Sequence, residues 1–381
     1  MSEKQYQICT NCVMDTTDSE IKFNSEGICN HCIDFKEVRS KNWFPNAEGE
    51  QKLAAIYANL KQENKSKDYD CILGLSGGVD SSYLALKLFD AGIRPLVVHV
   101  DGGWNSELAV QNIESIINYC GWHLHTIVID WEEMRDLQLA YMKSGISNQD
   151  VPQDHAFFAS LYHFATKFNV NTVISGGNIS TECIFPESWH WSAMDADNLH
   201  AIHKKFGKLK LKKYKTIGFW SLYFYYPFIK KMKTLRPLNF MSYIKSEALI
   251  ELKERIGYKE YAKKHGESVF TKFFQNYYLP MKYGFDKRRP HLSSMIVTGQ
   301  ITREYALIEL EKPLYDEKEL QFDKEYVAKK LGISNQEFEA ILNMPKHSYK
   351  DFANMESKYQ FVKKVQNFVS NLLGRKISNY S

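Results

Sequence analysis

Apolar runs alternate with amphipathic stretches along the first half of the chain. Four short runs rich in aliphatic residues cover residues 71–75, 95–100, 124–129 and 172–175. Between them, apolar positions recur at helical spacing over residues 81–90, 107–119, 132–143 and 156–168. Short apolar runs of this kind are typical of buried strands, and strands that alternate with helices form a parallel sheet covered on both faces. We therefore expect an α/β domain over residues 65–185 with a doubly wound parallel sheet and right-handed crossovers.

The remaining chain divides into regions without this alternation. Residues 1–40 carry closely spaced cysteines, and residues 43–64 predict a connecting helix. Residues 186–240 are irregular, aromatic and basic, and we expect an insertion there. Residues 241–381 predict a mainly helical region for substrate or partner binding, ending in an amphipathic helix.

An uncharged aromatic segment covers residues 216–229 and follows a basic run at residues 204–215. It is too short to span a bilayer, which needs about 20 apolar residues. A patch for a membrane surface or an acidic partner is one interpretation. We expect instead a buried strand or helix beside a solvated basic loop.

Composition narrows the class of protein. The chain has 381 residues, 44% hydrophobic and 14% aromatic, which is typical of a globular protein with more than one domain. The net charge of +4 is modest, so we expect no nucleic-acid partner. The first seven residues hold no apolar signal core, so we expect a cytoplasmic protein without a membrane span.

A glycine-rich turn follows the first apolar run. It consists of Ser76, Gly77, Gly78, Val79, Asp80, Ser81 and Ser82. The glycines let the backbone approach a phosphate closely, and the N-terminus of the next helix favours an anion. The serines can donate hydrogen bonds, and Asp80 offers a carboxylate suited to Mg²⁺. No lysine follows the glycines, so this is not a Walker loop; it resembles the SGGxDS loop of the PP-loop ATP pyrophosphatases.

Ligands of such sheets bind beyond the C-terminal ends of the strands. Polar and glycine residues follow two further strands at that edge. We expect nucleotide contacts there from Asp101, Gly176, Gly177, Asn178, Thr181 and Glu182.

Four cysteines near the N-terminus form two CxxC pairs. They are Cys9, Cys12, Cys29 and Cys32. The spacing predicts a structural Zn²⁺ site, since four thiolates leave no open position for water. A redox pair is the weaker interpretation, because neither pair opens a helix in a βαβ unit.

Several longer motifs together resemble those of the N-acetyl sugar amidotransferase family. After the cysteine pairs and SGGVDSS come HVDGGWNSE (residues 99–107), VPQDHAFFASLY (151–162), SGGNISTE (175–182), KHGESVFTKFFQNYYLP (264–280) and DKRRPHLSS (286–294). The resemblance covers nearly the whole chain. One departure is Gly266, which stands where we expect an aromatic residue.

The resemblance implies an ATP-dependent amidotransferase. Such enzymes transfer AMP to the oxygen of an N-acetyl amide and replace it with ammonia, giving an acetamidino sugar. The products belong to bacterial surface polysaccharides such as lipopolysaccharide O-antigen, or to pseudaminic or legionaminic acid. The implied cofactors are ATP, Mg²⁺ and structural Zn²⁺. The implied partners are a glutaminase subunit like that of imidazole glycerol phosphate synthase and, in many cases, a cyclase-like subunit.

Site residues follow from the motifs. Asp80 and Ser76 would act at the phosphates. His265 and Glu267 would move protons, or form a structural pair. Gln153, Asp154 and His155 lie at a helix start, where capping competes with substrate binding. Lys287, Arg288, Arg289 and His291 would contact a sugar-nucleotide diphosphate or the leaving pyrophosphate, and a solvated helix end is the alternative for the cations.

A tRNA-thiolating PP-loop enzyme with a zinc knuckle is the alternative function. Such an enzyme needs reactive cysteines near the nucleotide, whereas Cys71, Cys120 and Cys183 are scattered. A non-catalytic zinc adaptor would leave the convergent loops without a role. Because no cysteine here has the pattern of a glutaminase nucleophile, we expect ammonia to come from another chain.

Overall fold

The computed structural model describes residues 5–261 and 266–373, with side chains to residue 365. Its centre is a five-stranded sheet with the order β3-β2-β1-β4-β5. The strands are β1 (Cys71–Gly74), β2 (Pro95–Asp101), β3 (Leu124–Val128), β4 (Thr172–Ile174) and β5 (Lys233–Leu235). Every neighbouring pair is parallel, which confirms the predicted α/β class.

The fifth strand lies in the segment that we expected to be an insertion. β5 pairs with β4 through residues such as Thr234, which lies opposite Val173. The sheet therefore extends beyond residue 185, and the predicted boundary is too early. β5 was missed because it is a three-residue edge strand, Lys-Thr-Leu, with no apolar run.

Alternate residues of β1 point into two separate cores. Ile72 packs with residues of α5 (Trp131–Ser144), α6 (Val151–Lys167) and α8 (Ala196–Phe206). Leu73 packs with residues of α2 (Ala47–Glu63), α3 (Val79–Asp90), α4 (Glu107–Cys120) and α9 (Lys245–Ile256). Helices thus cover both faces, as a doubly wound sheet requires.

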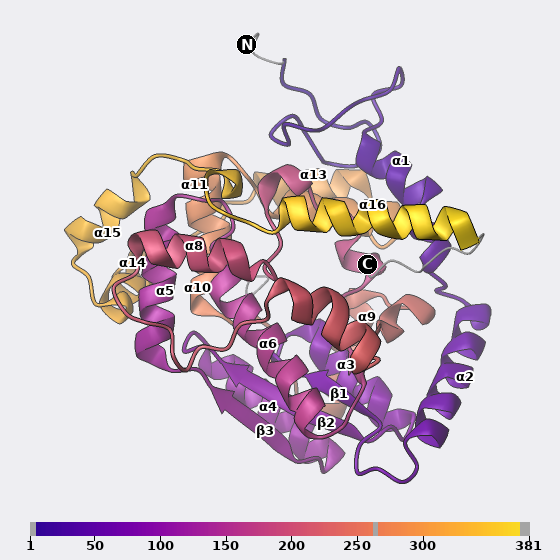
Figure 1. Ribbon diagram of the computed structural model, residues 1–381. Helices are drawn as coiled ribbons and strands as arrows, with labels where there is room; N and C mark the ends of the chain where they lie inside the picture. The colour runs from indigo at the N-terminus through magenta and orange to yellow at the C-terminus, as the bar shows by residue number, and fades with distance from the viewer. Residues whose placement is uncertain (1–4, 262–265, 374–381) are drawn as a thin grey trace.

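The C-terminal region is mainly helical, as predicted. It contains α10 (Val269–Phe273), a π-helix (Phe274–Tyr278), α11 (Leu279–Tyr283), α12 (Arg288–Val297), α13 (Arg303–Glu311), α14 (Glu317–Leu331), α15 (Asn335–Leu342) and α16 (Glu356–Leu373). Shorter elements are α1 (Asn30–Glu37), α7 (Ile179–Glu182) and 3₁₀ turns at Arg39–Asn42, Glu187–Trp189, Pro237–Phe240 and Tyr349–Asp351. Figure 1 shows α1 and the cysteine segment at one end of the molecule, with the sheet at the other.

The aromatic segment is buried at Ile217 and Phe219, but the expectation that it is a buried strand or helix is wrong for residues 221–229. Ser221–Ile229 forms a π-helix in which no residue is buried, and the side chains of Trp220 and Phe228 are 69% and 61% exposed. The exposed rings contact one another in tilted arrangements, since the centroid of Phe224 lies 5.0 Å from that of Trp220 and 6.3 Å from that of Phe228. The adjoining Phe219 is buried in a core cluster, and the partly buried Tyr223 and Tyr226 pack against core residues. None of the described helices has the length and apolar character needed to cross a bilayer.

Candidate functional site

The four N-terminal cysteines form a buried cluster. Their Sγ atoms all lie within 4.8 Å of one another, and three pairs are 3.7 to 3.9 Å apart. A tetrahedral Zn²⁺ with Zn–S bonds of about 2.3 Å places its sulfurs about 3.8 Å apart. The backbone N–H of Cys29 and the amide of Asn11 donate to the sulfurs of Cys9 and Cys32. The donor set therefore fits a closed structural zinc site, and it is the only metal-ligating group of this kind in the described part of the chain.

His31 lies beside the cluster but has another partner. Its Nε2 is 2.7 Å from the buried Asp18 carboxylate. Asp18 also accepts a hydrogen bond from Ser188. The pair thus joins the cysteine module to the rest of the chain.

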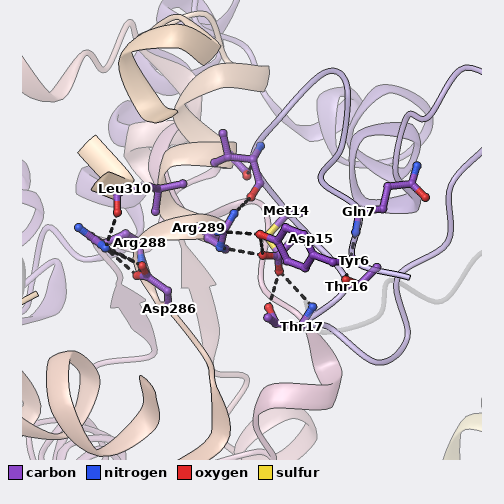
Figure 2. Close-up of polar contacts among 12 residues, drawn as sticks. Tyr6, Gln7, Met14, Asp15, Thr16, Thr17, Asp286, Arg288, Arg289 and Leu310 are labelled. Atoms are coloured by element: carbon purple, nitrogen blue, oxygen red, sulfur yellow. Dashed lines mark hydrogen bonds and ion pairs between the residues drawn. The ribbon is translucent and has the colours of Figure 1, made fainter. Parts of the chain in front are cut away.

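The two arginines at the start of α12 have separate structural partners, and Arg289 holds the cysteine module in place (Figure 2). Arg289 donates to the carbonyl of Val13 at 2.8 Å and pairs with the buried Asp15 at 3.0 Å. Arg288 binds Asp286 and three carbonyl oxygens at residues 309–312, near the end of α13. These guanidinium groups are therefore engaged in structural contacts.

The other two residues predicted to bind substrate in this region also have protein partners. The Lys287 ammonium lies 3.5 Å from the centre of the Phe185 ring. His291 Nδ1 is 2.9 Å from the carbonyl of Thr181. None of the four residues lines either of the two cavities described below.

The predicted phosphate loop has the geometry of an anion cradle. Gly77 has φ of +81°, and a Cβ there would lie 2.6 Å from the carbonyl oxygen of Ala109, so only glycine fits. Ser76 Oγ bonds Ser81 Oγ at 3.0 Å and accepts from Gly78 N–H. Helix α3 begins at Val79 without a side-chain cap. The loop thus presents hydroxyls and the positive end of a helix to one space.

This space is a cavity of about 500 Å³. Ser76, Gly78, Asp80 and Ser81 line it from the first loop, and Gly176, Gly177 and Glu182 line it from the loop after β4. The structure therefore brings together the two loops that the sequence predicted to meet.

Charge in this cavity would favour a divalent cation beside any bound phosphate. Asp80, Glu182, Glu260 and Glu267 line it, and Lys245 is the only cation among its described lining residues. Phosphates placed beside several carboxylates need metal ions to offset the repulsion. Mg²⁺ commonly binds one or two carboxylates together with substrate phosphates, and Asp80 and Glu182 offer such ligands.

Besides Gly77, four predicted nucleotide residues do not line the cavity. Ser82 is fully buried, and its Oγ has no hydrogen-bond partner among the described residues. The Asp101 carboxylate accepts from the N–H of Gly103 at 2.7 Å. Asn178 caps α7 by accepting from Thr181 N–H and Oγ1. They shape the loops, and none lines the cavity.

A second cavity of about 340 Å³ adjoins the first. Gly74, Ser76 and Glu267 line both, so the phosphate loop and the segment before α10 form their common wall. One side is apolar, with Phe157, Phe158 and Leu161 of α6. The polar lining consists of His99, Asn105, Asp150, Gln153, Asp154, Ser268, Thr271 and Gln275.

Gln153 and His155 were both predicted to bind substrate, but only Gln153 lines a cavity. Gln153 lines the second cavity and lies within 3.5 Å of Ser268 and Thr271. His155 is fully buried; its Nδ1 donates to the carbonyl of Ala193, and its Nε2 accepts from Ile217 N–H. Burial lowers the pKa of His155 to about 4. His155 is therefore a neutral structural residue that lines neither cavity.

The segment KHGES is described from Gly266 onward, and His265 lies outside the described residues. A Cβ at Gly266 would come within 2.8 Å of Cβ of Tyr261, so the glycine permits a close contact. Glu267 follows, and its backbone carbonyl accepts from Ser106 N–H at 2.8 Å. This contact holds the segment against the start of α4.

Several residues of the site were not selected from the sequence. They are Tyr243, Lys245, Tyr261, His99 and Asn105. Tyr258 and Tyr261 both donate to the carbonyl of Gly77 at 3.0 Å. His99 and Asn105 stand in the motif HVDGGWNSE, and that motif was the available signal.

Comparisons with known proteins give one family match. Residues 267–366 match the model described as LPS biosynthesis protein WbpG-like, C-terminal domain. None of the curated proteins compared with the chain matches it.

Two solved structures are similar at 13% identity. The NH3-dependent NAD synthetase from Campylobacter jejuni has a TM-score of 0.32 and covers 78% of this chain and 98% of its own. The NMN synthetase from Francisella tularensis has a TM-score of 0.31, with 75% and 96% coverage. Superpositions at this level do not bear on function. The match over residues 267–366, which begin at the glutamate common to both cavities, supports the resemblance of this chain to the N-acetyl sugar amidotransferase family.

Proposed function

We propose that this protein is an ATP-dependent amidotransferase of lipopolysaccharide biosynthesis that converts an N-acetyl sugar into an acetamidino sugar. The observation that carries the proposal is the pair of adjoining cavities. One is lined by the phosphate loop, and the other is walled in part by the segment that matches the WbpG-like domain.

The two cavities suit the two halves of this chemistry. ATP would occupy the 500 Å³ cavity, with its phosphates on the loop and Mg²⁺ at Asp80 and Glu182. The N-acetyl sugar would occupy the 340 Å³ cavity, with its acetyl group toward Ser76, which lines both cavities. The amide oxygen attacks the α-phosphorus, pyrophosphate leaves, and AMP becomes the leaving group on carbon. Ammonia then replaces AMP.

The chain's own residues have defined tasks in this scheme. Ser76 and Ser81 orient the phosphates, and the N-terminus of α3 stabilises the charge that develops on pyrophosphate. Phe157, Phe158 and Leu161 exclude water beside the acyl carbon. The metal supplies charge neutralisation when it is bound.

The cysteines do not favour sulfur transfer to tRNA. Burial raises the pKa of Cys183 to about 11 and that of Cys120 to about 12, and it also raises the pKa of Cys71. Thiols in this state are poor nucleophiles at neutral pH. Ammonia is proposed to come from a separate glutaminase subunit, with a cyclase-like subunit as a further candidate partner.

The test is a reconstitution with purified protein. ATP, Mg²⁺, high ammonium and a panel of N-acetylhexosamines, free and UDP-linked, should give an amidine with one AMP and one pyrophosphate for each product. Glutamine alone should be inert until a glutaminase is added. Efficient use of glutamine by this chain alone, or sulfur incorporation into tRNA, would overturn the proposal.

A further inference from the structure

Four titratable side chains line the second cavity. They are His99 on β2, Asp150 and Asp154 near the start of α6, and Glu267 before α10. Glu267 also lines the nucleotide cavity, so this group of residues adjoins the place where an adenylated amide would lie.

Three of the four side chains are already engaged. His99 Nδ1 is 2.9 Å from the carbonyl of Leu75, and its Nε2 accepts from the Asn105 amide. Asp150 accepts a hydrogen bond from Thr271 Oγ1 at 3.0 Å. Glu267 takes part in further polar interactions. A proton taken up by any of these groups would disturb an existing contact.

Asp154 differs from its neighbours. Its carboxylate makes no hydrogen bond or ion pair with any residue in the described ranges, 5–261 and 266–365, although it lines a polar cavity. Burial raises the pKa of Asp154 to about 8, and the Asp150 carboxylate one helical turn earlier adds to this rise. Lys287 opposes the rise, and the Tyr214 hydroxyl is the other titratable group that interacts with Asp154. Carboxyl groups with these properties are characteristic of acid–base sites.

We propose that Asp154 is the general base of the second cavity, and that it accepts a proton from the ammonia nitrogen during amidine formation. This inference rests on the proposed function and assigns one of its steps.

The step balances as follows. The lone pair of ammonia forms the C–N bond to the adenylated imidate carbon, which leaves a positive charge on that nitrogen. One N–H bond breaks, and its proton moves to the Asp154 carboxylate. The C–O bond then breaks, and its electron pair leaves with AMP. The product is an amidinium ion, and Asp154 returns its proton to solvent.

The test compares Asp154→Asn with Asp197→Asn. Asparagine keeps the size of the side chain and removes its basicity. Asp197 is on α8 in a surface ion pair with Lys358, so it serves as the matched control. In Asp154→Asn, ammonia-dependent amidine formation should fall by about 100-fold or more. The adenylation step is measured as the exchange of pyrophosphate into ATP that requires the N-acetyl sugar. Its rate should stay near the wild-type rate in both variants.

Hydroxylamine provides a second readout that a merely structural role would not affect. The nitrogen of its adduct is more acidic than that of the ammonia adduct, so water can take the proton. Asp154→Asn should therefore form amidoxime at nearly the wild-type rate. With ammonia as the nucleophile, the wild-type rate is divided by the fraction of ammonia that is unprotonated at each pH. This corrected rate should rise toward pH 8 and then level off. The variant should lack this rise.

The outcomes separate two failures. If wild-type protein forms no amidine or amidoxime with any sugar of the panel, the proposed function fails. If wild-type protein is active and Asp154→Asn matches it with ammonia, Asp154 is not the base. Loss of pyrophosphate exchange in a folded Asp154→Asn protein would also overturn the inference, since Asp154 would then serve sugar binding or adenylation.

Discussion

The Tyr243 hydroxyl donates a hydrogen bond to Oδ1 of Asp80, across 163 positions of sequence. Tyr243 precedes α9 and is 3% exposed, whereas Asp80 lines the nucleotide cavity from the first turn of α3. Burial and the Asp80 charge both raise the pKa of Tyr243, which keeps its proton on the oxygen. The helical region thus orients the carboxylate proposed to bind Mg²⁺.

Replacing Asp80 with asparagine should abolish most Mg²⁺-dependent pyrophosphate release. The amide is a weaker ligand for Mg²⁺ than the carboxylate, and we expect a loss of about 100-fold or more. Thermal unfolding should show an intact fold. A variant with wild-type turnover would contradict the assignment of the phosphate loop.

Tyr243→Phe tests the hydrogen bond itself. It removes one donor to a charged acceptor, so adenylation should fall by about 10-fold, which is less than in Asp80→Asn. Tyr83→Phe is the matched control, because the Tyr83 ring contacts the Tyr243 ring, with centroids 5.4 Å apart. Equal rates in the two tyrosine variants would show that the Asp80 contact has no catalytic effect.

The cysteine cluster should hold about one Zn²⁺ per chain. A Cys9/Cys12 double serine variant should lose the metal and unfold at a lower temperature, since metal binding contributes to folding. Cys183→Ala is the control: it removes a buried cysteine that packs against the four predicted ligands without being one of them, and this variant should retain Zn²⁺. Metal analysis of the three proteins makes the comparison, and a double variant that retains Zn²⁺ would mean that the ligand set is wrong.

Arg289→Ala should affect stability rather than substrate binding. It breaks a pair with the buried Asp15 and a bond to Val13, so the free energy of unfolding should fall by about 3 kcal/mol. KM values for ATP and sugar should stay within about two-fold of wild type, which corresponds to a change in binding free energy of well under 1 kcal/mol. Arg39→Ala removes an exposed ion pair and serves as the control. A large rise in the sugar KM at unchanged stability would restore the substrate role expected from the sequence.

Acidification should destabilise the protein partly through His155. Its folded pKa, about 4, lies below the unfolded value of 6.5, so the unfolded state binds more protons between these limits. Stability should therefore fall as the pH decreases from 6.5 to 4, by up to about 3 kcal/mol from this residue. Unfolding measured against pH should give a shallower slope for His155→Gln than for wild type. Identical slopes would contradict a buried neutral histidine.

Strands β1, β2 and β4 could be predicted because nearly all their residues are buried, whereas β3 was predicted from its apolar run although it is partly exposed. Runs such as Ile72 to Leu73 need only be apolar to serve two cores, and the sequence pattern shows this directly. β5 lacks this signal because it is only three residues long and its Lys and Thr are exposed. The exposure of the π-helix was not predicted, because its outer rings contact one another while Tyr223 and Tyr226 reach the cores.

The candidate site could be predicted where glycine chemistry fixes the backbone. Gly77 and the loop after β4 meet as expected, because a parallel sheet brings its loops to one edge. The partners of the basic cluster at residues 287–289 could not be predicted in this way. A run of positive charges attracts a bound diphosphate and a carboxylate of the same chain alike, and Arg289 pairs with Asp15, more than 270 residues away in sequence.

The contacts of the cysteine module with α12 and α13 affect the order in which the polypeptide folds during its synthesis. Besides its contacts near residues 183–188, the module is held by Arg289, Ser293 and Arg303, which donate to Val13 O, accept from Val13 N–H and donate to Cys12 O. Chains are made from the N-terminus at about 5–20 residues per second, so these three residues emerge long after the cysteines that they hold. The final seating of the module therefore follows the synthesis of α12 and of the start of α13.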